Sequence, residues 1–241
     1  MTKLRADTLG VLGGMGPLST ADFIRKVTEC TPTGGDADHI PMIVLSAPDI
    51  PDRVGSILRG VGPSPLPHLI ARRALLESAG ARSIAMPCNT AHHWADEMMD
   101  GSSLPFIGIV DATLAAIGRL RDRPTAVGLI ATAGTLASGF YQRRLAAEGI
   151  DCVVPSDADM AEKVVRGIEL VKRHQITQAA PLLSEAIRGL LDGGAGIVIL
   201  ACTEVELALG DDDLLEFCLD SNLALAQACV ECALAQRRQY P

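Results

Sequence analysis

Residues 8–20, TLGVLGGMGPLST, decide the fold of this chain. The apolar residues 8–12 predict a short buried strand, and the glycine-rich residues 13–17 predict the loop that leaves it. Ser19 or Thr20 is then expected to cap a helix. A strand that leads through glycines into a helix is typical of open parallel α/β sheets, which bind ligands at the carboxyl ends of their strands.

The same pattern returns in the second half of the chain. GLIATAGTLAS (residues 128–138) corresponds to VLGGMGPLST (residues 11–20), and LACTEVEL (residues 200–207) corresponds to AMPCNTAH (residues 85–92). In both halves the cysteine stretch follows the glycine stretch at a similar distance. The repeat therefore predicts that each half is an α/β unit with one cysteine at the carboxyl edge of its sheet.

We expect two pseudo-symmetric lobes, each with a mostly parallel sheet flanked by helices. The first lobe is predicted to comprise residues 1–112 together with a C-terminal helix at residues 220–241. The second is predicted to comprise residues 113–219. A chain of 241 residues is long enough for two such lobes.

The composition agrees with this architecture. Hydrophobic residues make up 48% of the chain but aromatic residues only 3%, so the core must be aliphatic, as in parallel sheets covered on both faces. The net charge is −8, and no cluster of Lys and Arg indicates a nucleic-acid partner. No apolar run has the length of a membrane span, which predicts that the protein does not bind a membrane.

The seven cysteines are an odd number scattered along the chain, which is not a disulfide framework. We therefore expect a reduced, cytoplasmic setting with free thiols. Cys229 and Cys232 form a CxxC pattern, but it lies in an expected helix without a second metal-binding pair. We interpret it as helix packing and predict no metal site.

The glycine loop resembles a dinucleotide fingerprint only weakly. Ser19 occupies the third glycine position, and Pro17 lies inside the loop. No acidic residue closes the second expected strand at residues 42–45. The loop is instead expected to present backbone N–H groups to a smaller anion.

Arg53 ends a proline-stiffened segment, SAPDIPDR, that leaves the second expected strand. A guanidinium group held there could bind a carboxylate through two hydrogen bonds. A surface ion pair with Asp49 or Asp52 is an equally good interpretation of these residues alone.

Cys88 and Cys202 are the candidate reactive groups. Thiols on either side of a stereocentre can exchange its proton, one removing it from one face and the other returning a proton to the opposite face. The charge that develops on the substrate then needs hydrogen-bond donors. Suitable polar side chains follow the expected strands, namely Asn89, Thr90, Thr132, Thr135 and Thr203.

Five stretches, GGMGP, IPDR, MPCNTAH, ATAGT and CTE, occur in this order along essentially the whole chain. In them the chain resembles the cofactor-independent aspartate/glutamate racemase family, and most closely its aspartate racemase branch. The resemblance implies an active site at the lobe interface, a homodimer, and catalysis without pyridoxal phosphate or another cofactor.

The resemblance also implies roles for individual residues. Cys88 and Cys202 match the catalytic pair. Arg53 matches the group that holds the distal carboxylate, and a second basic group there is either Lys172 or Arg173. The remaining matches are Asn89, Thr90 and Thr203 for the α-carboxylate or amino group, and Met15 and Thr132 for the pocket lining.

Two further residues are expected to tune the cysteines. His92 fits the first cysteine motif and is expected to cap or orient its loop. Glu204 follows Cys202 and is expected to tune this thiol or to bind the substrate amine. A carboxylate placed at a helix N-terminus for the helix dipole explains Glu204 equally well.

The predicted function is the interconversion of L- and D-aspartate, and also of glutamate, by two-base proton exchange. The substrate is a small dicarboxylic amino acid. The alternative is a cysteine-dependent decarboxylase or isomerase of a related carbon acid, of the malonate, maleate or hydantoin type. A non-catalytic amino-acid binding module is disfavoured because both thiols are present.

Overall fold

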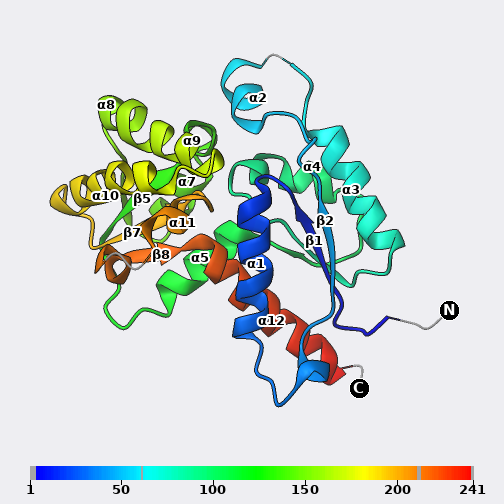
Figure 1. Ribbon diagram of the computed structural model, residues 1–241. Coiled ribbons are helices and arrows are strands. Elements are labelled where there is room, and N and C mark those ends of the chain that lie inside the picture. Colours follow the sequence, from blue (N-terminus) through cyan, green and yellow to red (C-terminus); the bar gives the residue numbers. More distant parts are fainter. Residues whose placement is uncertain (1–3, 61, 211–212, 240–241) are drawn as a thin grey trace. The chain divides into compact units, whose positions relative to one another are not determined.

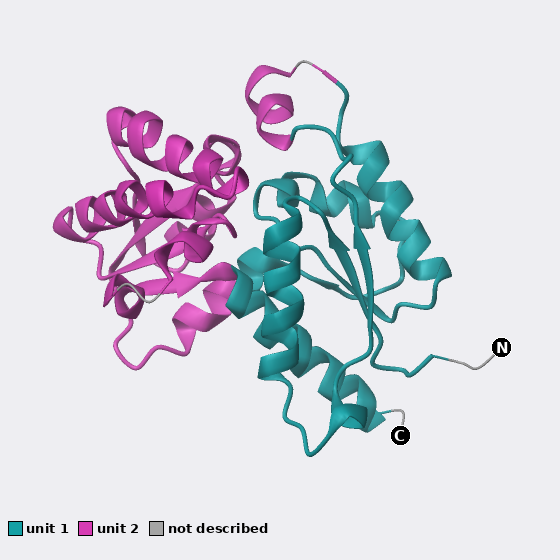
Figure 2. Cartoon of the chain, in the orientation of Figure 1, with its two compact units in different colours: residues 1–52, 63–112, 222–241 teal, residues 53–62, 113–221 magenta. Residues whose placement is uncertain are grey.

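The computed structural model describes residues 4–60, 62–210 and 213–239. Two compact units, coloured separately in Figure 2, make up the chain. Unit 1 comprises residues 1–52, 63–112 and 222–241, and unit 2 comprises residues 53–62 and 113–221. Within the described ranges, no helix combines the length and apolar character needed to cross a lipid bilayer.

Unit 1 is built on a four-stranded parallel sheet with the strand order β2-β1-β3-β4. Figure 1 labels β1 and β2 of this sheet. Its strands are β1 (Leu9–Gly13), β2 (Met42–Ser46), β3 (Ser83–Ala85) and β4 (Phe106–Ile107). All five residues of β1 are buried, as expected for a central strand with helices on both faces.

The helices of unit 1 lie between these strands in the sequence or follow the last of them. They are α1 (Pro17–Cys30), η1 (Asp36–Asp38), α3 (Leu66–Ser78), η2 (Thr90–Trp94), α4 (Ala95–Met99), most of α12 (Ser221–Gln239) and the first residues of α5 (Ile109–Gly118). A buried hydrogen bond joins α12 to α1, because Asn222 donates to the Asp22 carboxylate at 2.9 Å. Within α1, Lys26 pairs with the same carboxylate at 2.6 Å.

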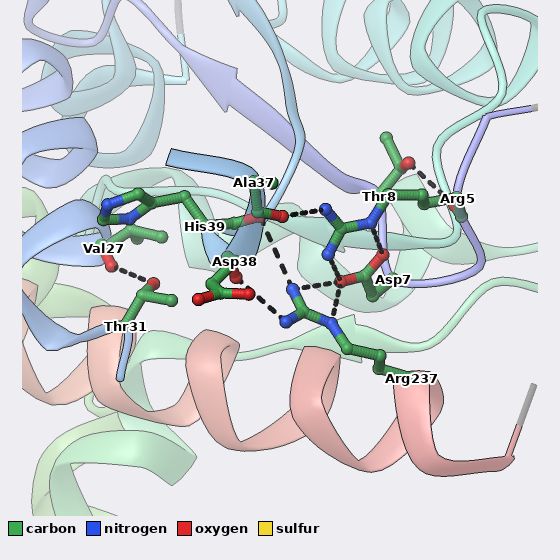
Figure 3. A network of polar contacts seen from close by, with 9 residues as sticks. All are labelled: Arg5, Asp7, Thr8, Val27, Thr31, Ala37, Asp38, His39 and Arg237. Atoms are coloured by element: carbon green, nitrogen blue, oxygen red, sulfur yellow. Dashed lines mark hydrogen bonds and ion pairs between the residues drawn. The ribbon is translucent and has the colours of Figure 1, made fainter. Parts of the chain in front are cut away.

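A second polar network holds the far end of α12 (Figure 3). Asp7 is 1% exposed and accepts hydrogen bonds from the guanidinium groups of Arg5 and Arg237, at 2.8 to 3.0 Å. Arg237 also donates to the carbonyl oxygen of Asp38 at 2.9 Å, and Arg5 donates to that of Ala37 at 2.8 Å. Burial raises the pKa of Asp7, but its two arginine partners outweigh burial, so the pKa lies below its usual value. The carboxylate therefore remains charged and ties α12 to the start of unit 1.

Unit 2 contains a second four-stranded parallel sheet, with the order β6-β5-β7-β8. Its strands are β5 (Ala126–Ala131), β6 (Asp151–Val153), β7 (Ile197–Ala201) and β8 (Cys218–Asp220). Its helices are α2 (Arg53–Arg59), α6 (Ala133–Ser138), α7 (Phe140–Ala147), α8 (Asp157–Asp159), the π-helix η3 (Met160–Val165), α9 (Arg166–Lys172), α10 (Ile176–Asp192), α11 (Val205–Leu209) and η4 (Asp213–Phe217).

The two sheets have the same plan. In each sheet, the strand that comes first in the sequence lies between the second and the third, and the fourth lies beside the third. The prediction of two α/β lobes with parallel sheets flanked by helices is confirmed. β3 corresponds to β7 in this plan, so the loops after these two strands are equivalent.

The structure corrects the expected cap of the first helix. Gly16 is the N-cap of α1 and Pro17 is its first residue, because proline lacks an N–H and its fixed φ suits this position. Ser19 and Thr20 lie inside the helix. The Thr20 hydroxyl instead accepts a hydrogen bond from the Gly14 N–H at 2.8 Å and donates to the Gly16 carbonyl at 2.9 Å.

The glycine loop passes very close to its neighbours. A Cβ atom on Gly13 would lie 2.3 Å from Cγ2 of Thr20. Gly14 has φ +92°, and a Cβ atom there would lie 2.2 Å from the backbone nitrogen of Ala47, just after β2. Glycine is therefore required because the loop fills the space between α1 and the end of β2.

The segment after β2 also differs from the expected loop. Arg53 begins the helix α2, which packs against α6 in unit 2. Residues 53–62 therefore belong to unit 2, although they lie between two segments of unit 1 in the sequence.

Candidate active site

The glycine loop and the first cysteine loop lie at one edge of the unit 1 sheet. β1 and β3 are parallel neighbours, with Leu9 opposite Ser83 and Val11 opposite Ala85. Their carboxyl ends therefore meet at the same edge, which is where α/β sheets bind ligands. Met15 follows β1 and Cys88 follows β3, so this edge carries both residues.

The residues of the first cysteine loop are buried. Cys88, Asn89 and Thr90 are 6%, 3% and 6% exposed, and Met15 in the neighbouring loop is 4% exposed. The Cys88 N–H donates to the carbonyl oxygen of Met86 at 2.8 Å, which closes a tight turn directly after β3. This turn leads into η2 and fixes the backbone at the thiol.

His92 connects this turn to the next strand exit. Its Nδ1 lies 2.8 Å from the carbonyl oxygen of Cys88, and its Nε2 lies 3.0 Å from the backbone nitrogen of Ile109, the first residue of α5. Since the carbonyl oxygen accepts and the N–H donates, a neutral imidazole with its proton on Nδ1 satisfies both contacts. Burial lowers the pKa of His92 to about 4, which favours this neutral form.

The equivalent edge of unit 2 carries the two predicted threonines. Thr132 is the N-cap of α6, and its hydroxyl accepts a hydrogen bond from the Thr135 N–H at 3.1 Å. The two hydroxyl oxygens lie 3.0 Å apart. β5 and β7 are parallel neighbours, so this cap lies at the same sheet edge as the second cysteine loop.

The second cysteine loop brings a thiol, a hydroxyl and a carboxylate together. Cys202, Thr203 and Glu204 are 4%, 3% and 5% exposed. The Cys202 thiol donates to Oε2 of Glu204 at 3.2 Å, and the Thr203 hydroxyl donates to the same oxygen at 3.4 Å. The Val205 N–H donates to the Cys202 carbonyl at 3.0 Å, which closes the turn into α11.

The surroundings of Cys202 favour the protonated thiol. Burial raises its pKa well above the ordinary value, and the Glu204 carboxylate raises it further. The positive charge of Lys172 acts in the opposite direction.

Lys172 and Arg173 differ in their place on α9. Lys172 is the last residue of the helix, and its charge acts on Cys202. Arg173 is the C-cap, and its N–H donates to the carbonyl oxygens of Glu169 and Leu170. Close packing sets the position of α9, since a Cβ atom on Gly167 would lie 2.7 Å from Cγ of Leu183 in α10. Both residues stay candidates for the second basic group.

Arg53 shares unit 2 with Cys202, Lys172 and the threonine cap. It is the first residue of α2, which packs on α6, and α6 begins directly after Thr132. The predicted site residues thus fall into two groups. Unit 1 holds Met15, Cys88, Asn89, Thr90 and His92, and unit 2 holds Arg53, Thr132, Thr135, Lys172, Arg173, Cys202, Thr203 and Glu204.

The other cysteines have environments typical of packing. All seven cysteines lie in the described residues, and none of them forms a disulfide. Burial raises the pKa of Cys152 to about 11 and raises that of Cys229 well above its ordinary value. Among residues 4–60, 62–210 and 213–239, no group of three or more His, Cys, Asp or Glu side chains could hold a metal ion.

Sequence reasoning missed two features of these sites. The Ile109 N–H, which donates to His92, is a backbone group, so no residue type in the sequence indicates this contact. The assignment of Arg53 to unit 2 depends on the packing of α2, which no motif indicates.

Comparison with known proteins gives a consistent result. The sequence model of a family described as Asp/Glu/Hydantoin racemase matches residues 12–229. The broad specificity amino-acid racemase RacX of Bacillus subtilis is 30% identical over 240 residues, which cover 94% of this chain and 98% of that protein.

Solved structures show the same fold. An aspartate racemase from Picrophilus torridus superimposes with a TM-score of 0.82 at 30% identity, covering 94% of each chain. A glutamate racemase from Francisella tularensis, solved with D-glutamate, gives a TM-score of 0.65 at 16% identity, over 96% of this chain and 82% of that one. At that identity the second comparison supports the fold alone.

Proposed function

Because the chain belongs to the Asp/Glu/Hydantoin racemase family and its homologues are racemases, which are isomerases, we propose that it interconverts L- and D-aspartate, with glutamate as a second substrate. The observation that carries this proposal is the equivalent position of the two thiols. Cys88 follows β3 and Cys202 follows β7, and these strands correspond in the plan of the two sheets. Each unit therefore supplies one buried thiol to the proposed reaction.

The proposed mechanism is two-base proton exchange at Cα. One cysteine, as thiolate, removes the α-proton, and the other, as thiol, donates a proton to the opposite face. The electron pair left on Cα spreads into the α-carboxylate, so hydrogen-bond donors to that carboxylate lower the barrier. Asn89, Thr90 and Thr203 are buried polar side chains beside the two thiols in sequence, and we assign this task to them.

The preference for a dicarboxylic amino acid follows from charge. The chain has a net charge of −8, so an anionic substrate needs local positive groups. Arg53 and Lys172 both belong to unit 2, where Lys172 already acts electrostatically on Cys202. We propose that these two cations bind the distal carboxylate, and that Met15, Thr132 and Thr135 line the pocket. The aspartate racemase of Picrophilus torridus, at 30% identity, supports this substrate class.

Two further features belong to the proposal. We propose a homodimer, as the family resemblance implies. We also propose a reduced, cytoplasmic setting, which the seven cysteines, none of them in a disulfide, support.

The deciding experiment uses metal-free and pyridoxal-free protein with L-aspartate in deuterated water. Optical rotation should fall to zero while deuterium enters Cα, followed by NMR. The same assay with glutamate, alanine and other amino acids tests breadth, since RacX is a broad specificity racemase. Evolution of carbon dioxide without racemisation would instead favour a decarboxylase. Absence of both inversion and deuteration across the whole panel would overturn the proposal.

Replacing Arg53 with leucine should weaken the use of aspartate far more than the use of alanine. The lost charge-assisted hydrogen bonds are worth about 1.5–3 kcal/mol, so kcat/KM for aspartate should fall about 10- to 100-fold. Arg59→Leu, which removes the other arginine of α2, is the matched control and should have little effect. Equal losses for aspartate and alanine would remove Arg53 from the distal-carboxylate site.

A further inference from the structure

His92 lies beside the first cysteine loop and contacts both the cysteine and the next strand exit. Its Nδ1 lies 2.8 Å from the carbonyl oxygen of Cys88, and its Nε2 lies 3.0 Å from the backbone nitrogen of Ile109. The ring also contacts Phe106 of β4, with 5.4 Å between the two ring centroids. One side chain therefore joins the turn after β3 to β4 and to the start of α5.

Backbone groups occupy both ring nitrogens. The Ile109 N–H can only donate, so Nε2 accepts and carries no proton, and the Nδ1–H group donates to the Cys88 carbonyl. A cationic ring does not fit these contacts, because its Nε2–H would face another N–H group. Burial lowers the pKa of His92 to about 4 against the opposing charge of Asp111, which agrees with a neutral ring near pH 7. The ring is therefore unsuited to exchange protons with a substrate or with the Cys88 thiol.

The backbone contacts of Cys88 show what the ring holds. The Cys88 N–H donates to the carbonyl oxygen of Met86 at 2.8 Å, and the Cys88 carbonyl accepts from the ring of His92. Both backbone polar groups of the cysteine are thus held, one from each side. The segment that follows, η2, is a 3₁₀-helix of five residues, a type of helix with poor hydrogen-bond geometry. The ring therefore gives the cysteine turn a second support, which comes from the neighbouring strand.

Resting on the function proposed above, we propose that His92 is a positioning residue for the Cys88 thiol, which it serves as a neutral link between two strand exits and not as an acid or base. The backbone at Cys88 sets the direction of its Cα–Cβ bond, so the ring sets where the sulfur lies relative to the α-proton. A misplacement of about 1 Å can lower a rate about 100-fold. Cys202 follows β7 in unit 2, so loss of the ring should impair proton transfer at Cys88 and spare that at Cys202.

The test is His92→Phe, which keeps a ring for the contact with Phe106 but removes both hydrogen bonds. Racemisation of aspartate should fall about 10- to 100-fold in kcat, with little change in KM. His92→Asn keeps an amide N–H near the place of Nδ1. It should recover part of the rate, because the hydrogen bond to the Cys88 carbonyl can form again. His93→Asn, at the exposed neighbouring position, is the matched control and should racemise at the wild-type rate.

A second readout separates positioning of Cys88 from a general loss of structure. In deuterated water, a thiol that still reaches Cα exchanges the α-proton of its own enantiomer even where inversion is slow. In His92→Phe, the enantiomer deprotonated by Cys202 should keep its α-exchange, while the exchange of the other enantiomer falls together with racemisation. This pattern should match that of Cys88→Ala. A loosened fold would instead slow the exchange of both enantiomers to the same extent.

Nitrogen NMR tests the state of the ring without any need for activity. In protein labelled with ¹⁵N-histidine, His92 should give the signals of a neutral ring that is protonated on Nδ1 at pH 7, and their absence from the spectrum of His92→Phe identifies them. A cationic ring, or a neutral ring with its proton on Nε2, would overturn the proposed bonding.

The outcomes are distinct. An active wild-type protein with full activity in His92→Phe, or with equal loss of exchange for both enantiomers, would overturn the role of His92 and leave the racemase proposal standing. An inactive wild-type protein would overturn the racemase proposal itself, and with it the role of His92. Circular dichroism melting shows whether each variant keeps its fold, and His92→Asn provides the same test if His92→Phe does not fold.

Discussion

Replacing either Cys88 or Cys202 with alanine is expected to abolish racemisation, with a loss of at least about a thousandfold in kcat. Two-base exchange has one proton transfer at each thiol, and neither variant can complete both. The fold should survive, because each substitution removes one sulfur from a buried turn that backbone hydrogen bonds maintain. Loss of optical rotation with L- and D-aspartate is the measurement.

The Cys88→Ala and Cys202→Ala variants should also show which thiol acts on which enantiomer. Each keeps one thiol, which can still remove and return the α-proton on its own side. In deuterated water, one variant should exchange the α-proton of L-aspartate without inversion, and the other should exchange that of D-aspartate. The result would assign each thiol to one enantiomer.

Cys229→Ala is the matched control, since this buried thiol of α12 lies outside the proposed site. It should racemise at the wild-type rate. Full activity in either Cys88→Ala or Cys202→Ala would contradict the two-base assignment.

Gly14→Ala is expected to be the most damaging single-methyl substitution in the glycine loop. Gly14 has φ +92°, which alanine adopts only with strain, and the added Cβ atom would lie 2.2 Å from the backbone nitrogen of Ala47. Backbone cannot move aside like a flexible side chain. Strain and overpacking together should lower the free energy of unfolding by about 2–4 kcal/mol.

Thermal unfolding checks this prediction, with an expected decrease on the order of 10 °C for a chain of this size. Gly189→Ala is the control. This exposed glycine lies inside α10, nothing lies within 4 Å of the new Cβ atom, and alanine favours the helix there. It should unfold at the same temperature or higher. A Gly14→Ala protein as stable as the wild type would show that the loop can move away from Ala47.

The main fold was predictable because the strands are apolar runs with abrupt ends. β1 and β7 both end at a glycine or cysteine stretch, so the residue pattern marks their carboxyl ends directly. Cys88 and Cys202 lie in the loops after β3 and β7. Their equivalence in the sheet order follows the repeat seen in the sequence.

α2 could not be predicted for a physical reason. Its seven residues, RVGSILR, contain an interior glycine and show too few turns for a helical periodicity. The helix is stabilised by packing on α6, a contact between segments far apart in the sequence.

A contact between Cys202 and Glu204 was one of the interpretations of Glu204 that the sequence left open. Residues two apart face each other in no regular helix, and only the turn into α11 brings the thiol to the carboxylate. Lys172 and Arg173 were ambiguous because adjacent helix positions look alike in a motif. In the structure Lys172 is the last residue of α9 and Arg173 is its C-cap, and we propose Lys172 because its positive charge lowers the pKa of Cys202.

Because α12 comes last in the sequence but belongs mostly to unit 1, the two units are completed in a fixed order during synthesis. Residues 113–221 leave the ribosome before residues 222–239, so all four strands of unit 2 are available while unit 1 still lacks its last helix. Until then the Asp7 carboxylate lacks Arg237, and Asp22 in α1 lacks Asn222. The unit that carries Cys202 can therefore mature first on the nascent chain, and the unit that carries Cys88 is completed only when its final helix has been made.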